Sequence, residues 1–566
     1  MTPNIAQAFS KWLFLCAFFL ATSSLSTYAE ERSAPDNRLF APLLEGMGVY
    51  SRPISTDSIA AQRYFDQGIA YIHGYYFSQA AASFEQALVH DPDHPMLLWG
   101  LALASGPNPN SRAVGLPDDP KGFALQTIAK AKKLGAQLPA AEQALVGALQ
   151  VRLDKQQIPD RGERDQAYIS ATEIAYRAYP NDPDLGFLLA DAVMTKNAWS
   201  YWQNDLKPKP GIKLAMEALK NALKVHPLHP GANHLTIHLY EDEHPSRAVP
   251  SANRIASLIP SAGHIVHMPA HIFVRMGRFQ EAIDTNLRSW EADQTAAQLW
   301  QGYDFPKYVT YPVSFKNHPS HATDFIRFSA TFSGQYQLAI DYANKTEKIV
   351  SKSPRPGAGL KPMATVWLVE KIFGKWSNLI DDHTSEPEHP FLKGMWAYAR
   401  GSALANTGQL DAARAALALI DEMQQVATLK LLMVRFNTAS VVLNIARHGL
   451  AGEISLAAGD VDAAIGSFEQ AVAAEDALKY IEPFDWPQPM RLFLGAALLT
   501  RGDAAAAEDV YRATLGRVRE NGWALFGLQQ ALQAQGKAKQ AADANRRFGQ
   551  AWQKGEITLT RSAVLH

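Results

Sequence analysis

The sequence predicts an all-α solenoid, in which antiparallel helix pairs stack to form a concave inner surface. The 566 residues would suffice for three or four ordinary domains, yet no polar linker longer than a few residues divides them. Similar segments recur along the chain, each with a glycine between two stretches of helical character. One helix pair cannot bury its own apolar face, so several pairs must stack.

The first repeat begins at Arg63 and reads RYFDQGIAYIHGYYFSQAAASFEQALVHDP. It carries small and large residues at the spacings of a tetratricopeptide (TPR) unit: Gly68, Tyr71, Ala80, Phe84 and Pro92. Glycine and alanine are expected where helices A and B of the unit cross, because they let the two backbones approach. Large residues are expected to fill the gaps between neighbouring pairs.

The same pattern returns towards the C-terminus as RGSALANTGQLDAARAAL, AGEISLAAGDVDAAIGSFEQA and GAALLTRGDAAAAEDVYRATL. Their predicted turns contain Gly408, Gly459 and Gly502. We therefore expect N-terminal TPR-like repeats over residues 56–225, histidine-rich central repeats with an aromatic insertion over residues 226–350, and C-terminal TPR repeats over residues 351–566.

The N-terminus predicts export. Lys11 precedes an apolar run, WLFLCAFFLA, and a small polar tract that ends at Ala29. This pattern is typical of a signal peptide over residues 1–29, followed by an N-terminal extension over residues 30–55. A membrane anchor is the alternative, but a span needs about 20 apolar residues. We expect a periplasmic or secreted protein with no stable membrane span after cleavage.

The composition indicates which classes of partner and of metal ligand are not expected. Lys and Arg number 54 against 55 Asp and Glu, so no general positive field favours nucleic acid, which is not expected as a partner. The only cysteine, Cys16, lies within the predicted signal peptide. The mature chain is therefore expected to contain neither disulfides nor thiolate metal ligands.

Histidines are concentrated in the central region, where ten of the 17 fall between His226 and His321. His234 and His238 are four residues apart, and His264 and His271 flank His267 at helical spacing. On a helix, each set would share one face. Because neutral imidazole is the commonest side-chain metal ligand, the pattern indicates a metal site.

The repeat register places these histidines on three successive A helices. Gly277 and Phe279 mark a turn and a helix B, so the preceding helix A should cover residues 263 to 276. One period of 34 residues earlier, helix A should cover residues 229 to 242, and one unit later it should open near Ser320. Adjacent helices pack about 8 to 10 Å apart, so the three can share one site.

Pro269 lies inside the second of these helices and allows two interpretations. Either it kinks the helix and turns His264 and His267 away from the direction of His271, or the helix begins at Pro269 and leaves two histidines in a loop.

The segments HPGANHLTIHLYEDE, IPSAGHIVHMPAHIFVRMGRFQEAI and HPSHATDFIRFSATFSGQYQLAI together resemble a bacterial family of exported TPR proteins. The resemblance extends over nearly the whole mature chain and implies a fold and a site more than a reaction. Relatives often carry histidine where this chain has Phe77, so that position is not counted as a ligand.

The predicted metal ligands are imidazoles of the central region: His234, His238, His264, His267, His271, His318 and His321. Such a set, with carboxylates but no thiolate, suits a divalent transition metal such as Zn, Cu, Fe or Mn. So many ligands indicate two metals, or one metal with histidines around its ligands. Glu241 is a candidate ligand or general base, and Arg275 is a candidate anchor for an anionic group. HLTIH lacks the glutamate of HExxH, so a protease of that class is not expected.

Two classes of function remain open from the sequence. The chain is expected to be a metal-dependent enzyme, hydrolytic or oxidative, with a small-molecule or peptide ligand in the groove. Alternatively, it is a scaffold for a protein partner, or a metal-trafficking protein without catalysis. Weaker candidates are Asn108 in GPNPN, which could be an amide at the groove's edge or part of a turn, and Glu482 in an insertion that could form a lid.

Overall fold

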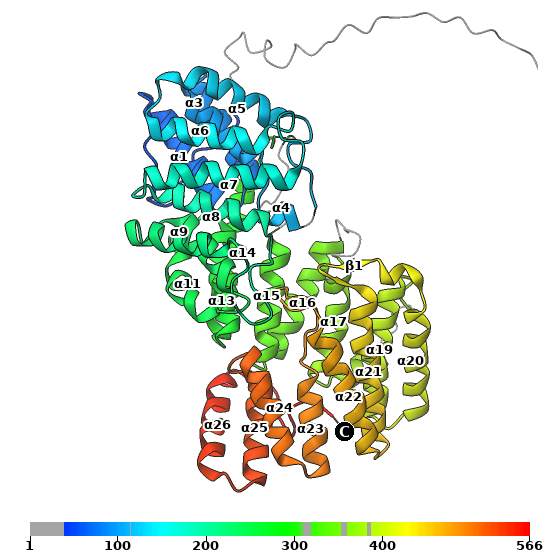
Figure 1. Ribbon diagram of the computed structural model, residues 1–566. Coiled ribbons are helices and arrows are strands. Elements are labelled where there is room, and N and C mark those ends of the chain that lie inside the picture. Colours follow the sequence, from blue (N-terminus) through cyan, green and yellow to red (C-terminus); the bar gives the residue numbers. More distant parts are fainter. Residues whose placement is uncertain are drawn as a thin grey trace, which may run out of the picture. The chain divides into compact units, whose positions relative to one another are not determined.

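The computed structural model describes residues 39–113, 115–306, 308, 318–351, 359–381 and 386–565. Residues from Phe40 onward form one compact unit, so the three repeat regions are continuous parts of a single body. Within the described residues the only strands are β1 (Met433–Val434) and β2 (Asn437–Thr438), which pair as a two-residue hairpin. The predicted all-α class is confirmed, and consecutive helices pack as pairs (Figure 1).

The N-terminal repeats include helices that pack against the first histidine-bearing helix of the central region. Their helices are α1 (Ile59–His73), α2 (Phe77–His90), α3 (Pro95–Ala104), α4 (Pro109–Ala113), α5 (Phe123–Leu134), α6 (Ala140–Leu153), α7 (Arg161–Ala178), α8 (Pro183–Lys196) and α9 (Ile212–Val225), with the 3-10 turn η1 (Gly135–Gln137). The expected close approach is present, since a Cβ on Gly68 would lie 2.6 Å from the Phe84 ring and one on Gly100 would lie 2.5 Å from it.

The central repeats contain the histidine-rich segments. Their helices are α10 (Pro230–Tyr240), α11 (Val249–Ile255), α12 (Gly263–His267), α13 (Pro269–Arg275), α14 (Phe279–Leu299), α15 (Pro319–Phe332) and α16 (Tyr336–Ser351), with the 3-10 turn η2 (Pro245–Ala248). The predicted turn at Gly277 is confirmed, with a positive φ of 74° that favours glycine. Part of the aromatic insertion, residues 307 and 309–317, lies outside the described residues.

The structure around Pro269 agrees with part of each of the two interpretations. A new helix, α13, does begin at Pro269, where the missing N–H costs no hydrogen bond. The histidines before it are nevertheless helical, because His264 and His267 lie on the short helix α12. The helix predicted over residues 263 to 276 is therefore two segments joined at Met268.

The C-terminal repeats follow the central repeats in the chain. Their helices are α17 (Leu360–Ile372), α18 (Trp376–Ile380), α19 (Pro390–Asn406), α20 (Leu410–Gln424), α21 (Ala439–Ala457), α22 (Val461–Asp476), α23 (Arg491–Arg501), α24 (Ala504–Arg517), α25 (Gly522–Ala534) and α26 (Ala538–Ala551), with the 3-10 turn η3 (Ala427–Lys430). The last repeats contact the central ones, since the Trp523 indole donates to the carbonyl of Thr331 at 3.0 Å and Lys361 Nζ donates to the carbonyl of Pro483 at 2.6 Å.

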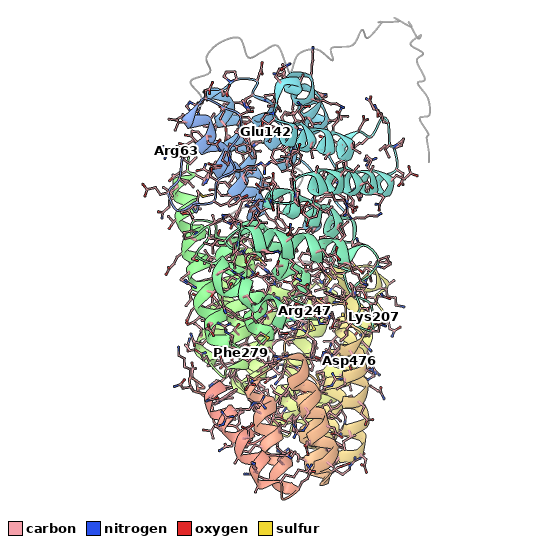
Figure 2. The ribbon with its side chains drawn as sticks, turned by 60° about the vertical axis from the view of Figure 1, so that its left-hand side comes forward. Arg63, Glu142, Lys207, Arg247, Phe279 and Asp476 are labelled. Carbon is pink, nitrogen blue, oxygen red and sulfur yellow. The ribbon has the colours of Figure 1, made fainter. Side chains whose placement is uncertain are left out.

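Charged side chains of both signs occur on the surface of all three regions. Figure 2 labels exposed examples at Arg63, Lys207, Arg247 and Asp476. Among the residues that the structure describes, no helix has the length and apolar content needed to cross a membrane. The predicted signal peptide, residues 1–29, lies outside the described residues.

Candidate metal centre

The structure brings the side chains of the seven predicted histidine ligands together in one region. They come from α10, from the α12 and α13 segments, and from the start of α15: His234, His238, His264, His267, His271, His318 and His321. Six of the seven are buried, and His321 is half-buried. The three histidine-bearing segments therefore present these side chains to one another, as the repeat register predicts. Phe77, which was not counted as a ligand, is buried.

Three of the imidazoles, His234, His238 and His264, form what we call the first cluster. Each offers a ring nitrogen within 4.8 Å of the nitrogens offered by the other two. The Nε2 atoms of His234 and His238 lie only 3.0 Å apart. The Nδ1 atom of His234 is 2.5 Å from the carbonyl oxygen of His73, and that of His264 is 3.0 Å from the carbonyl oxygen of Gly74.

The second cluster consists of His267, His271 and His321, whose ligand nitrogens also lie within 4.8 Å of one another. The Nε2 atoms of His267 and His271 are 2.9 Å apart. The Nδ1 of His267 contacts Asn286 Oδ1 at 2.6 Å, and the amide of Asn286 donates to the carbonyl of Ala282. That second bond orients the amide so that its oxygen faces the imidazole, and His267 therefore donates from Nδ1.

His318 lies between the two clusters, with ring centroids 5.1 Å from His264 and 5.2 Å from His267. Its Nδ1 is 2.6 Å from Asp293 Oδ2, while its buried Nε2 has no hydrogen-bond partner. Asp293 also accepts a hydrogen bond from the Tyr76 hydroxyl at 2.7 Å. Glycine is required at position 263, where a Cβ would lie 2.4 Å from Asp293 Oδ1.

These contacts share one chemical consequence. A neutral imidazole that donates from Nδ1 to an oxygen keeps its lone pair on Nε2, which is the arrangement typical of metal-bound histidine. The Nε2 lone pairs of His234 and His238 face each other at 3.0 Å and repel unless a proton or a cation lies between them. Nitrogens bound tetrahedrally to one zinc ion at about 2.0 Å are separated by about 3.3 Å, which is close to this spacing.

Four of the imidazoles are held in their neutral form. Burial, together with the neighbouring imidazoles, holds the pKa values of His264 and His267 well below the usual range, and burial with the charge of Arg435 does so for His321. Burial and His238 do the same for the pKa of His234. Because only the neutral ring has a free lone pair, these four histidines are ready to bind a cation at neutral pH.

Two carboxylates lie beside the clusters. Glu241 Oε2 is 2.9 Å from His271 Nδ1 and 3.3 Å from His238 Nδ1, and Glu482 Oε2 is also 2.9 Å from His271 Nδ1. Burial opposes charge on both partners, but the attraction of His271 and His238 lowers the pKa of Glu241, and the two carboxylates raise the pKa of His271. Glu241 therefore lies beside histidines of both clusters.

Arg275 is placed differently from the other candidates. Its Nη2 donates to the carbonyl of Asp242 at 2.6 Å, and its guanidinium lies over the Tyr480 ring at 5.3 Å. The arginine therefore holds the segment that carries Glu482 against the end of α10. Its guanidinium contacts these two groups rather than an imidazole.

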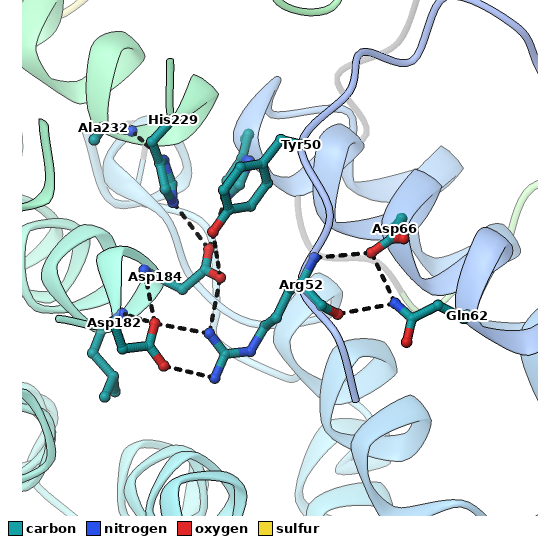
Figure 3. A network of polar contacts seen from close by, with 10 residues as sticks. Tyr50, Arg52, Gln62, Asp66, Asp182, Asp184, His229 and Ala232 are labelled. Atoms are coloured by element: carbon teal, nitrogen blue, oxygen red, sulfur yellow. Dashed lines mark hydrogen bonds and ion pairs between the residues drawn. The ribbon is translucent and has the colours of Figure 1, made fainter. Parts of the chain in front are cut away.

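A second polar network supports the turn between α1 and α2, whose carbonyls orient the first cluster (Figure 3). Asp184 accepts hydrogen bonds from Tyr50 at 2.8 Å, Arg52 at 2.9 Å and His229 at 3.0 Å, and it lies 3.5 Å from His73 Nε2. The Nδ1 of His229 accepts from a backbone N–H, so its Nε2 must donate to Asp184. We interpret this network as structural, because its carboxylate already has several donors.

Several of these residues cannot be recognised from the sequence. Tyr76 and Asp293 carry no motif, and Asn286 lies on a helix B that faces the site. Glu482 belongs to the insertion that could form a lid, and it contacts His271, which is buried rather than exposed in an open groove. The one signal for His73 was its place in the first repeat, close to the position where relatives carry histidine.

Comparisons with known proteins assign no family to this chain. No protein-family model matches the chain, and no curated protein matches it. Among solved structures, a human IFIT1 dimer with PPP-AAAA is 11% identical over 88% of this chain and 92% of its own, with a TM-score of 0.28. A monomeric IFIT1 mutant with Gppp-AAAA is 11% identical over 81% and 91%, with a TM-score of 0.31. Naa15/Naa10 bound to HypK-THB is 12% identical over 87% and 71%, with a TM-score of 0.23. At TM-scores this low, the similarities carry no inference about ligands or partners.

Proposed function

We propose that this protein is an exported TPR-like solenoid that binds transition-metal ions through its seven central histidines and acts as a metal-dependent enzyme. The observation that carries the proposal is the orientation of the rings. In five of the seven imidazoles Nδ1 is hydrogen-bonded to an oxygen atom: His234, His238, His264, His267 and His318. A structural hydrogen-bond cluster would pair donors with acceptors, whereas the Nε2 atoms of His234 and His238 face one another at 3.0 Å.

The two clusters suit two metal ions. Each supplies three imidazoles, which is the number found in catalytic zinc sites that keep a fourth position open for water or substrate. His318 lies between the clusters and offers an unpartnered Nε2 to either ion. Bound there, a divalent ion would activate water for hydrolysis or, if redox-active, support oxidation.

The protein's own residues would orient the rings and move protons. Asn286, Asp293 and the α1–α2 turn hold the rings in one tautomer, which keeps Nε2 available. Glu241 lies beside histidines of both clusters, so it could take a proton from an attacking water in the role of general base.

A second function, metal storage or transfer without catalysis, is favoured by burial. His234 and His267 have no exposed surface, and only His321 is half-buried. A protein that only holds metal needs no substrate pocket at its ligands. Storage and catalysis can be distinguished by whether the metal-loaded protein converts a substrate.

The metal content of the untagged chain from residue 30 onward tests the proposal. We expect inductively coupled plasma mass spectrometry, after reconstitution with Zn, Cu, Fe or Mn, to find about two ions per chain if each cluster holds one. The metal that is retained selects hydrolytic or oxidative screens. Failure to retain any of the four metals would contradict the proposal and favour a protein-binding scaffold.

The residues that orient the imidazoles provide a sharper prediction. Asn286→Ala removes the acceptor for His267 Nδ1, and we expect metal affinity to fall about 10- to 100-fold, as is typical when such a partner is lost. Competition with a chromogenic chelator measures this affinity. Asn344→Ala is the matched control, because Asn344 also donates to a carbonyl four residues earlier on a neighbouring helix. Equal affinities for the two variants would argue against His267 as a ligand.

Export is also part of the proposal, supported by the N-terminal pattern of Lys11, an apolar run and Ala29. Expression of the full chain in a bacterium should yield a periplasmic or secreted protein that begins at Glu30. N-terminal sequencing of the recovered protein checks this directly. Recovery of intact protein in the membrane fraction would instead support an anchor.

A further inference from the structure

Two carboxylates and an imidazole meet beside the second cluster. The Nδ1 atom of His271 lies 2.9 Å from Glu241 Oε2 and 2.9 Å from Glu482 Oε2, and each of the three groups offers a ligand atom within 4.8 Å of the others. All three residues are buried, with 5% or less of each exposed. They come from the end of α10, from α13 and from the insertion between α22 and α23. We call this group the carboxylate site.

The hydrogen bonds of the second cluster determine where a neutral His271 has its lone pair. His267 donates from Nδ1 to Asn286, so its Nε2 is an acceptor. His271 Nε2 lies 2.9 Å from that atom and must donate to it. The lone pair of a neutral His271 is therefore on Nδ1, the atom that contacts both carboxylates.

Three buried acceptor atoms thus lie together without a donor. Neither His271 Nδ1 nor Glu482 Oε2 has a hydrogen-bond partner among the described residues, although only 2.9 Å separates them. Their contact therefore lacks the angles of a hydrogen bond. Buried acceptors and charges without a partner are costly, and a cation between the three atoms would offset that cost.

The spacing of the carboxylate site fits a six-coordinate cation. Neighbouring ligands of an octahedral ion at about 2.1 Å are separated by about 3.0 Å, which is close to the two distances of 2.9 Å. Carboxylates suit manganese, magnesium and calcium, whereas imidazole suits transition metals. Two carboxylates with one imidazole therefore suit divalent manganese better than a cluster of imidazoles alone does.

Both carboxylates are themselves held in place. The Tyr480 hydroxyl donates to Glu482 Oε1, and the Arg275 guanidinium lies over the Tyr480 ring at 5.3 Å. The Nδ1 atom of His238 lies 3.3 Å from both oxygens of Glu241. Such contacts are typical of carboxylates that bind a metal, because they orient the ligands before the ion arrives.

We infer that the carboxylate site binds one divalent manganese ion through Glu241, His271 and Glu482, as a third site beside the two histidine clusters. Binding here does not require either cluster to be filled, so the inference goes beyond the proposed function. His271 binds through Nδ1 in this site and through Nε2 in the second cluster, so a ring that keeps one proton serves only one of them at a time. The general-base role of Glu241 belongs to the state in which the carboxylate site is empty. A proton on His271 Nδ1 is the competing occupant.

Manganese titrated into the chelator-treated chain from residue 30 onward tests the inference, with electron paramagnetic resonance reporting the free hydrated ion. We expect one saturable site in the wild type. Glu482→Gln keeps the shape of the side chain but removes its charge, and should weaken manganese binding about 100-fold. Glu475→Gln is the matched control, because half-buried Glu475 accepts a hydrogen bond from the Met490 N–H at 2.8 Å that glutamine can also accept. This control should leave manganese binding unchanged.

Tyr480→Phe provides a second variant if Glu482→Gln fails to fold, since it removes only the hydroxyl that orients Glu482. We expect manganese binding about tenfold weaker in Tyr480→Phe. Binding that does not saturate, or that is equal in the wild type and every folded variant, would overturn the inference and leave a proton as the occupant.

Zinc content after separate reconstitution of the same proteins distinguishes this inference from the proposed function. We expect Glu482→Gln to keep the zinc of the first cluster, to which Glu482 contributes no ligand. Saturable manganese binding without any retained zinc would refute only the histidine clusters. Retained zinc without saturable manganese binding would refute only the carboxylate site.

Discussion

Replacing His264, His267 and His271 together with alanine is expected to reduce the bound metal to less than about one-tenth of the wild-type content. The change removes one imidazole from the first cluster and two from the second. Neither cluster would then offer three nitrogens, and each lost ligand also removes a preorganised partner for the remaining ones. This is the largest effect that the proposed centre predicts, and elemental analysis after dialysis measures it.

The control for this variant is a second triple substitution, His90→Ala/His226→Ala/His448→Ala, which removes the same number of imidazoles from outside the centre. We expect its metal content to equal that of the wild type. Circular dichroism must show both proteins folded, since buried imidazoles also contribute to packing. Equal metal content in the two triple variants would mean that the metal is bound elsewhere on the chain or nonspecifically.

Asp184→Ala is expected to cause the largest loss of stability that can be predicted from a single polar side chain. Asp184 is 4% exposed and accepts hydrogen bonds from Tyr50, Arg52 and His229. Removing the carboxylate leaves these donors buried and partly unpaired, which should lower the free energy of unfolding by about 3 kcal/mol. Thermal or urea unfolding of the purified variant measures the loss.

The matched control is Asp205→Ala, because Asp205 pairs with Lys207 on the exposed surface and contributes little. Asp184→Ala should also weaken metal binding, because the same network supports the turn whose His73 carbonyl orients His234. A variant as stable as Asp205→Ala would show that the Asp184 network is not needed to hold this part of the fold. A destabilised variant with unchanged metal affinity would separate the network from the centre.

Much of the fold and the grouping of the central histidines could be predicted from the sequence, because both depend on local spacing. The turn at Gly277 and the start of α14 at Phe279 follow from the repeat pattern. The same register put histidines on α10 and on α15, and both contact the histidines of α12 between them, as expected. Pro269 could not be resolved in advance, since a proline that ends one helix and one that begins the next leave the same local pattern.

By itself, the sequence determined the helical repeats and the side chains available to one helix face, because positions three and four apart share a face whatever the remainder of the chain does. Only the tertiary structure decided which groups surround those side chains. Glu482 reaches His271 from a distant insertion, and Asp293 orients His318 from the adjacent helix B. Such contacts depend on how helix pairs stack and on where loops return, and spacing along the chain does not encode either.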